Sequence, residues 1–125
     1  MVKKSIIISG YCATGKSTFS QKISDEFKIP YFNKDFVKEN MADGFGLNNQ
    51  EVFNKGSIAT FNLMLHILEQ FLQVGKICIL EANFKKYEIE DIQKLLTKYN
   101  STCLTYLFRA DFEIIFRRFK CRSYL

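Results

Sequence analysis

The residues with the clearest chemical meaning lie near the N-terminus. A run of nine residues contains the eight-residue Walker A pattern G-x-x-x-x-G-K-[ST], followed by one threonine: Gly10, Tyr11, Cys12, Ala13, Thr14, Gly15, Lys16, Ser17 and Thr18. The run directly follows an apolar segment, 4–9, and opens a segment with helical periodicity. A strand before the loop and a helix after it are what a phosphate loop requires. We therefore interpret residues 10–18 as a nucleotide-binding loop.

Each part of this loop has a separate expected task. Gly10 and Gly15 allow the backbone to wrap closely around a phosphate, and the amides of residues 13–18 converge on it at the positive end of a helix. Lys16 is expected to reach the terminal phosphates, and Ser17 to ligate magnesium. The motif thus predicts a nucleoside triphosphate, ATP, and Mg²⁺ as the ligands of the chain.

Other classes of phosphate-loop protein do not match the rest of the sequence. A GTPase needs an N-K-x-D motif, and the nearest string, 33–35, has the wrong spacing; residues 43–46 match D-x-x-G but follow no predicted strand. A transporter ATPase carries its signature motif after a long insertion, for which 125 residues leave no room. No G-x-G-x-x-G dinucleotide motif occurs either. A small phosphoryl-transfer kinase remains.

The elements that must position this loop alternate along the chain. Short apolar runs at 4–9, 29–33, 76–81 and 102–108 predict strands, and each precedes a segment with helical periodicity. The first helix must end before Pro30, and further helices are expected at 57–74, at 87–99 and from 111 onward. Nearly all-apolar strands are typical of parallel sheets covered on both faces. We predict one α/β domain over 1–125, a three-layer P-loop NTPase sandwich with strand order 2-3-1-4 and helices on both faces.

Polar residues follow the second and third predicted strands, where open α/β sheets hold their ligands. Asp35 could accept the proton of an incoming hydroxyl, or it could only cap a helix that begins at Phe36. Glu81 ends a buried apolar run. Asn83 could bind substrate or only form a turn. His66, the single histidine, shares a helix face with polar residues and is expected at the surface.

At these positions the sequence resembles the compact P-loop kinases of the AAA_33 type, which are similar to the kinase domain of polynucleotide kinases and to zeta-toxin and adenylate-kinase-like folds. The family's D-x-[VI]-R segment corresponds to Asp35-Phe36-Val37-Lys38, with lysine in place of the usual arginine. The resemblance implies that Asp35 is the base that activates the acceptor and that Lys38 contacts substrate. It also implies that Glu81 serves magnesium, where the family usually has Asp, and that Arg118 and Arg122, four residues apart on one helix, clamp the phosphoryl group.

Two functions follow as expectations. The first is transfer of the γ-phosphate of ATP to a hydroxyl of a small molecule or of a nucleic-acid end. The second is a nucleotide-binding remnant without catalysis. The chain stops at Leu125, before the lid, fifth strand and last helix that the resemblance implies. Strand 102–108 would then be an exposed apolar edge, through which we expect self-association.

The composition is that of an ordinary globular domain, with 47% hydrophobic and 25% charged residues and a net charge of +5. The longest apolar runs are far shorter than the ~18 residues that a membrane span needs, and no signal region is apparent. We therefore expect a cytoplasmic protein with no membrane partner. The four cysteines lack C-x-x-C spacing and are interpreted as small buried hydrophobes, without disulfides.

Overall fold

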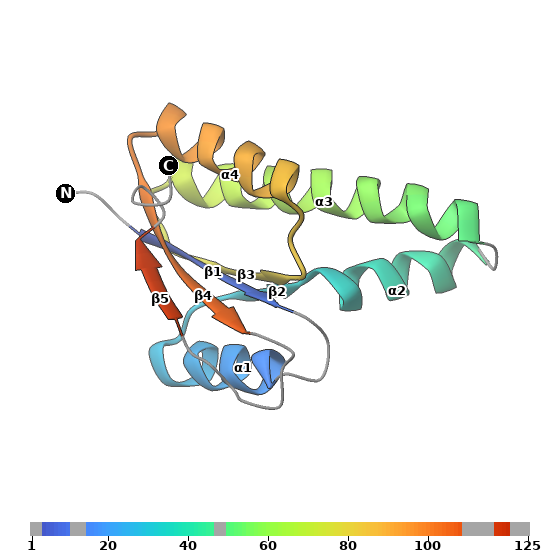
Figure 1. Ribbon diagram of the computed structural model, residues 1–125, viewed down its shortest axis with the longest axis horizontal. Helices are drawn as coiled ribbons and strands as arrows, with labels where there is room; N and C mark the ends of the chain where they lie inside the picture. Colours follow the sequence, from blue (N-terminus) through green and yellow to red (C-terminus); the bar gives the residue numbers. More distant parts are fainter. Residues whose placement is uncertain (1–3, 11–14, 47–49, 109–116, 121–125) are drawn as a thin grey trace.

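The computed structural model describes residues 4–10, 15–46, 50–108 and 117–120, and for 50–54 and 117–120 it describes the backbone alone (Figure 1). The elements alternate between strands and helices over most of the chain. In order they are β1 (Lys4–Gly10), α1 (Lys16–Phe27), β2 (Tyr31–Asn33), α2 (Lys34–Phe45), α3 (Gln50–Gln73), β3 (Ile79–Ala82), α4 (Lys86–Lys98), β4 (Thr102–Phe108) and β5 (Arg117–Lys120).

The strands form one sheet in the order β2-β3-β1-β4-β5. The first four strands are parallel to one another, so the predicted order 2-3-1-4 is confirmed. The register places Ile8 of β1 opposite Glu81 of β3 on one side and opposite Tyr106 of β4 on the other. Because parallel strands point the same way, the carboxyl ends of β1, β2 and β3 meet at one edge of the sheet.

Helices cover both faces of this sheet, which gives the predicted three-layer arrangement. In Figure 1, α1 lies on one face, and α3 and α4 lie on the other. Ile7 of β1 belongs to the core with α3 and α4, through Met64 and Ile92, whereas Ile8 belongs to the core with α1, through Phe19. Side chains that alternate between two covered faces explain why the strand sequences are mostly apolar.

Most helices match the expected positions, but the start of α3 and the C-terminal segment differ. Helix α1 ends at Phe27, before Pro30, as expected. Helix α3 begins at Gln50, earlier than the expected start at 57, and its first turns extend beyond the sheet alongside α2 (Figure 1). The hydroxyl of Thr60 lies 3.6 Å from Met41 Sδ of α2, whereas Phe61, the next residue, belongs to the core with Ile7 of β1. The apolar residues that pack against the sheet mark only the later turns of α3. The sequence pattern therefore did not predict the first turns of this helix.

The C-terminal part of the chain differs from expectation. Residues 117–120 form β5, an antiparallel strand paired with β4, where a helix was expected. The expectation that the sheet has no fifth strand, and that β4 is an exposed edge, is therefore wrong. The physical reason is that an unpaired β4 would leave a row of backbone N–H and C=O groups without partners, and β5 supplies them. Consequently, the argument for self-association through β4 no longer holds.

Two cysteines lie in the core of the fold. Cys78 and Cys103 are both fully buried, as expected of small hydrophobes, but Cys103 is disulfide-bonded, so the expectation of no disulfide is wrong for this residue. Burial raises the pKa of the free thiol of Cys78 to about 12.

Among the described helices, none combines the length and the apolar character needed to cross a membrane.

Candidate active site

Two glycines mark the ends of the phosphate loop. Gly10 ends β1 with φ 149°, and a Cβ there would lie 2.3 Å from the carbonyl oxygen of Phe108, so only glycine fits beside β4. Gly15 precedes α1 with φ 87°, a left-handed conformation that glycine adopts without strain. Four residues of the predicted loop, Tyr11, Cys12, Ala13 and Thr14, lie outside the described residues.

The first turn of α1 places two candidate residues next to β3. Lys16 is 5% exposed, and its Nζ lies 4.0 Å from Glu81 Oε2. Ser17 is exposed, and its hydroxyl donates to the same carboxylate oxygen at 2.9 Å. Thr18, the last residue of the motif, is also exposed. The structure therefore brings the sequence-predicted Lys16, Ser17 and Glu81 together.

Glu81 is also bound from the other side, by β2. The register pairs Asn33 with Glu81, and Tyr31 lies two residues earlier on the same face of the strand. Asn33 Nδ2 donates to Glu81 Oε2 at 2.7 Å, and the Tyr31 hydroxyl donates to Oε1. Burial, together with this bond to the carboxylate, raises the pKa of Tyr31 above its ordinary value of 10.0. Tyr31 therefore remains a protonated donor at neutral pH.

Helix α2 begins next to this network. Asn33 caps the helix, because its side chain accepts a hydrogen bond from the backbone N–H of Phe36 at 3.0 Å. The neighbouring Lys34 is buried and forms a 2.9 Å ion pair with Glu88 of α4. The cap is thus Asn33 and the helix begins at Lys34, so the alternative in which Asp35 only caps a helix starting at Phe36 is wrong.

Asp35 lies in the first turn of α2 with about half of its side chain exposed. It borders a cavity of about 420 Å³ that the end of the phosphate loop also borders. The lining residues come from α1, β2, α2 and β3 and are Gly15, Lys16, Ser17, Thr18, Asn33, Asp35, Phe36, Glu39 and Glu81. A hydroxyl compound and a terminal phosphate could therefore meet in this cavity.

The other sequence-predicted residues do not line this cavity. Lys38 is next to it, because its Nζ lies 3.8 Å from Asp35 Oδ1, one turn along α2. Asn83 is exposed just after β3 and does not line the cavity. Arg118 is in β5, opposite Tyr106, and Arg122 lies outside the described residues. The expected helix face carrying both arginines is therefore wrong, because Arg118 belongs to a strand.

Sequence reasoning did not identify Tyr31, Asn33 or Lys34 as part of the site. Asn33 carried a usable signal, since asparagine just before a helical segment is a typical N-cap. Tyr31 and Lys34 carried none, because their partners, Glu81 and Glu88, are 50 and 54 residues away in the sequence.

The residues around Glu81 suit magnesium better than a softer metal. Groups of three or more His, Cys, Asp or Glu side chains that could hold a metal do not occur in the described part of the chain. Magnesium does not need such a group, because it keeps several waters and is bound by one or two carboxylates together with substrate phosphates. The Glu81 carboxylate and the Ser17 hydroxyl are oxygen ligands of this kind, 2.9 Å apart.

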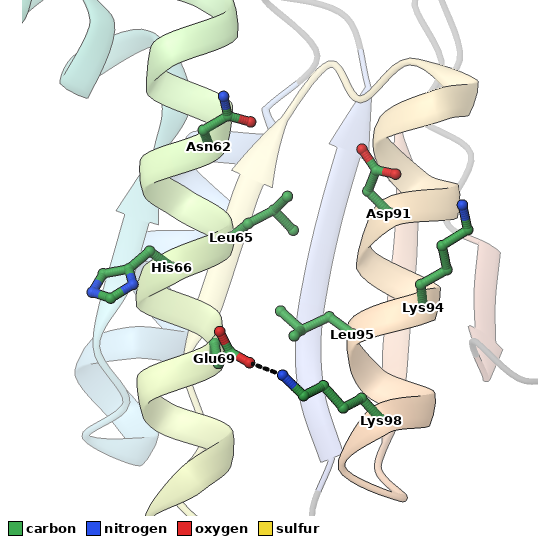
Figure 2. Close-up of a pocket in the computed structure, with 8 residues that line it drawn as sticks. All are labelled: Asn62, Leu65, His66, Glu69, Asp91, Lys94, Leu95 and Lys98. Carbon is green, nitrogen blue, oxygen red and sulfur yellow. Dashed lines mark hydrogen bonds and ion pairs between the residues drawn. The ribbon is translucent and has the colours of Figure 1, made fainter.

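A second cavity, of about 500 Å³, lies between α3 and α4 (Figure 2). Leu65 and Leu95 point toward each other across it, and Lys98 reaches Glu69 with a 3.0 Å ion pair. Tyr99 also donates to Glu69, at 2.7 Å, and the bonds to Tyr99 and Lys98 lower the pKa of the Glu69 carboxyl. His66 borders this cavity and is exposed, as expected. Lys98 and Glu69 of this cavity therefore pair with each other. The cavity lies between α3 and α4, on the face of the sheet opposite α1.

Comparisons with known proteins identify the fold. No protein-family model and no curated protein matches the chain. Among solved structures, a candidate kinase from Chloroflexus aurantiacus J-10-fl is 32% identical with a TM-score of 0.78. A gluconokinase from Sinorhizobium meliloti 1021 is 13% identical with a TM-score of 0.56, and the APS kinase of Mycobacterium tuberculosis is 11% identical with a TM-score of 0.58.

The comparisons cover most of this chain but less of the other proteins. They include 87%, 85% and 92% of this chain, and 60%, 56% and 82% of the respective structures. The chain thus spans about three fifths of the length of the first solved structures that it matches. Together with the sheet order and the phosphate loop, these likenesses define the class: the chain has the α/β P-loop NTPase fold, and kinases are its structural neighbours.

Proposed function

We propose that this chain is a P-loop kinase of the compact AAA_33 type that its sequence resembles. In this proposal it transfers the γ-phosphoryl group of ATP to the hydroxyl of a small molecule. One observation carries the proposal: Lys16 and Ser17 of the phosphate loop border the same cavity as Asp35 and Glu81. Phosphoryl transfer needs these groups in one place, because catalysis comes from positioning and from stabilising charge.

The phosphate-loop side of the cavity suits the nucleotide. The start of α1 offers backbone amides at the positive end of a helix, and Lys16 adds a full charge. Ser17 and Glu81 would hold magnesium, which neutralises charge on the phosphates when it is bound. Roles for Tyr11, Cys12, Ala13 and Thr14 rest on the Walker A motif.

The α2 side of the cavity suits the acceptor. Asp35 is the proposed general base: it takes the proton of the acceptor hydroxyl as the oxygen bonds to the γ-phosphorus and the bond to the β,γ-bridging oxygen breaks. ADP leaves and the acceptor carries the phosphoryl group. The proposed contacts of Lys38 and Asn83 with substrate, and of Arg118 and Arg122 with the phosphoryl group, rest on sequence reasoning alone.

The charge of this side favours a small molecule over a nucleic-acid end. Asp35 and Glu39 lie one helical turn apart and both border the cavity. Phe36, between them, is 67% exposed and offers an apolar surface. Lys38 offsets part of the charge of Asp35, and the two carboxylates still give this wall a net negative charge, which repels a polyanion. Carboxylates also accept hydrogen bonds from neutral hydroxyl groups. An uncharged hydroxyl compound therefore fits this wall better than a phosphodiester chain.

A direct test uses γ-labelled ATP with two panels of acceptors, one of sugars and other polyols and one of oligonucleotides with free hydroxyl ends. Label transfer to a member of the first panel, lost in Asp35→Asn, is the expected result. Transfer only to oligonucleotides would contradict the choice of acceptor. Magnesium-dependent ATP binding with no transfer to either panel would favour the non-catalytic nucleotide-binding protein.

A further inference from the structure

The Glu81 carboxylate is surrounded by donors from two different elements. It is 1% exposed, so its charge depends on protein groups to replace water. Its Oε2 atom faces the phosphate loop, where the Ser17 hydroxyl lies 2.9 Å away and Lys16 Nζ lies 4.0 Å away. Its Oε1 atom accepts from Tyr31 of β2. The two oxygens therefore have separate partners.

The side-chain amide of Asn33 contacts both the Glu81 carboxylate and the Tyr31 hydroxyl. Its Nδ2 atom lies 2.7 Å from Glu81 Oε2 and 3.1 Å from the Tyr31 hydroxyl. Its Oδ1 atom is occupied by the N–H of Phe36, so a flipped amide would turn an acceptor toward the carboxylate and lose the helix cap. The orientation of Asn33 is therefore determined, and with it the direction of the donor that faces Glu81.

We propose that Tyr31 is a positioning residue that, together with Asn33, keeps the Glu81 carboxylate turned toward Ser17 at the end of the phosphate loop. A carboxylate held at Oε1 cannot rotate freely, so Oε2 remains available on the side of the loop. Mutation of a residue that hydrogen-bonds to a metal-binding side chain commonly lowers the metal affinity by about 10- to 100-fold. The inference rests on the proposed function, in which Glu81 and Ser17 hold magnesium.

Tyr31→Phe tests this with the loss of a single hydroxyl. The ring packs beside the core of Ile8, Ile79 and Phe108, and phenylalanine retains that packing. Tyr99→Phe is the matched control, because it removes the same kind of bond, from a tyrosine hydroxyl to Glu69, away from the phosphate loop. A second variant, Asn33→Asp, keeps an oxygen for the cap and replaces the donor that faces Glu81 with a like charge.

The first readout is ATP binding by calorimetry, at a series of Mg²⁺ concentrations and in EDTA. Magnesium is expected to raise the ATP affinity of every variant, and the readout is the Mg²⁺ concentration at which half of this gain is reached. For Tyr31→Phe and Asn33→Asp, this concentration is expected to be about 10- to 100-fold higher than for the wild type. The affinity in EDTA should be unchanged for Tyr31→Phe, which a general structural defect would not produce. Magnesium curves for Tyr31→Phe that overlie those of the wild type and Tyr99→Phe would overturn the proposal.

The second readout does not depend on nucleotide. A crystal structure of Tyr31→Phe without ligands is expected to show the Ser17 hydroxyl and the Glu81 carboxylate no longer within hydrogen-bond distance. An unchanged contact would overturn the positioning role. If the wild type binds no ATP under any condition, the proposed function fails, and this structure still decides the role of Tyr31.

Discussion

Lys34 and Glu88 form an ion pair inside the protein, with Nζ 2.9 Å from Oε2 and side chains 7% and 0% exposed. The pair joins the start of α2 to α4, and Lys34 Nζ also lies 5.8 Å from the ring centroid of Phe61 in α3. Glu88 accepts in addition from the backbone N–H of Lys85, at 2.9 Å. Since Lys34 lies between Asn33 and Asp35, the pair holds the segment that carries the candidate base.

Removing one partner of this pair should destabilise the protein strongly. Lys34→Met is expected to lower the free energy of unfolding by about 3–5 kcal/mol, because it leaves the Glu88 carboxylate buried without its counter-charge. Urea denaturation measures the change. The exposed pair of Lys98 and Glu69 provides the control, and Lys98→Met should change stability far less. The double variant Lys34→Met/Glu88→Leu should recover much of the loss; a double variant as unstable as Lys34→Met would contradict this account.

Lys16→Ala should weaken ATP binding, because it removes the charge expected to face the terminal phosphates. A charge-assisted hydrogen bond contributes about 1.5–3 kcal/mol, so Kd should rise about 10- to 100-fold. Calorimetry with ATP measures this change. Lys22→Ala, on the exposed part of α1, should bind as the wild type does. Equal affinity of the Lys16 variant and the wild type would remove Lys16 from the nucleotide site.

Asp35→Asn should lower turnover by roughly 100-fold or more once an acceptor is known, while ATP binding is nearly unchanged. The reason is that the proposed base acts on the acceptor hydroxyl and not on the nucleotide. Steady-state kinetics and calorimetry on the same preparation separate the two effects. Asp43→Asn, exposed later on α2, is the control. A parallel loss of ATP binding and turnover would indicate that Asp35 supports the structure of α2 instead.

Gly10→Ala should be destabilising, since the new Cβ would lie 2.3 Å from the carbonyl oxygen of Phe108. Overpacking of this kind costs about 1–3 kcal/mol. Gly44→Ala, in helix α2 with no atom within 4 Å of the new Cβ, should stabilise by about 0.5–1 kcal/mol. Thermal and urea denaturation of both variants test the contrast, and two variants that shift stability in the same direction would contradict it.

Cys78 should resist alkylation in the folded protein. Its side chain is fully buried and its pKa is raised to about 12, so almost no reactive thiolate exists at pH 8. Iodoacetamide labelling at pH 8, followed by mass spectrometry of the peptide containing Cys78, should give modification in urea but not in native buffer. Rapid native labelling at this residue would show that the segment just before β3 opens readily.

Much of the fold follows from local sequence patterns. Glycines at 10 and 15, the run of apolar residues before them and Pro30 after the first helix are signals that neighbouring residues carry, and β4 lies at Thr102–Phe108, the predicted 102–108. Parallel order follows from the alternation of apolar runs and helical segments. These features depend on backbone conformation and burial over a few residues at a time, so the sequence alone was sufficient to determine them.

Which residues contact Glu81 and Lys34 was decided only by the tertiary structure. Glu81 meets Tyr31 and Asn33 because β2 and β3 pair in one particular register, and a shift of one residue would turn these side chains to the opposite face. Lys34 likewise meets Glu88 only once α2 and α4 are packed, and β5 formed because β4 offered an edge to pair with. Contacts between residues some 50 positions apart depend on register and packing, which no local pattern in this sequence encodes.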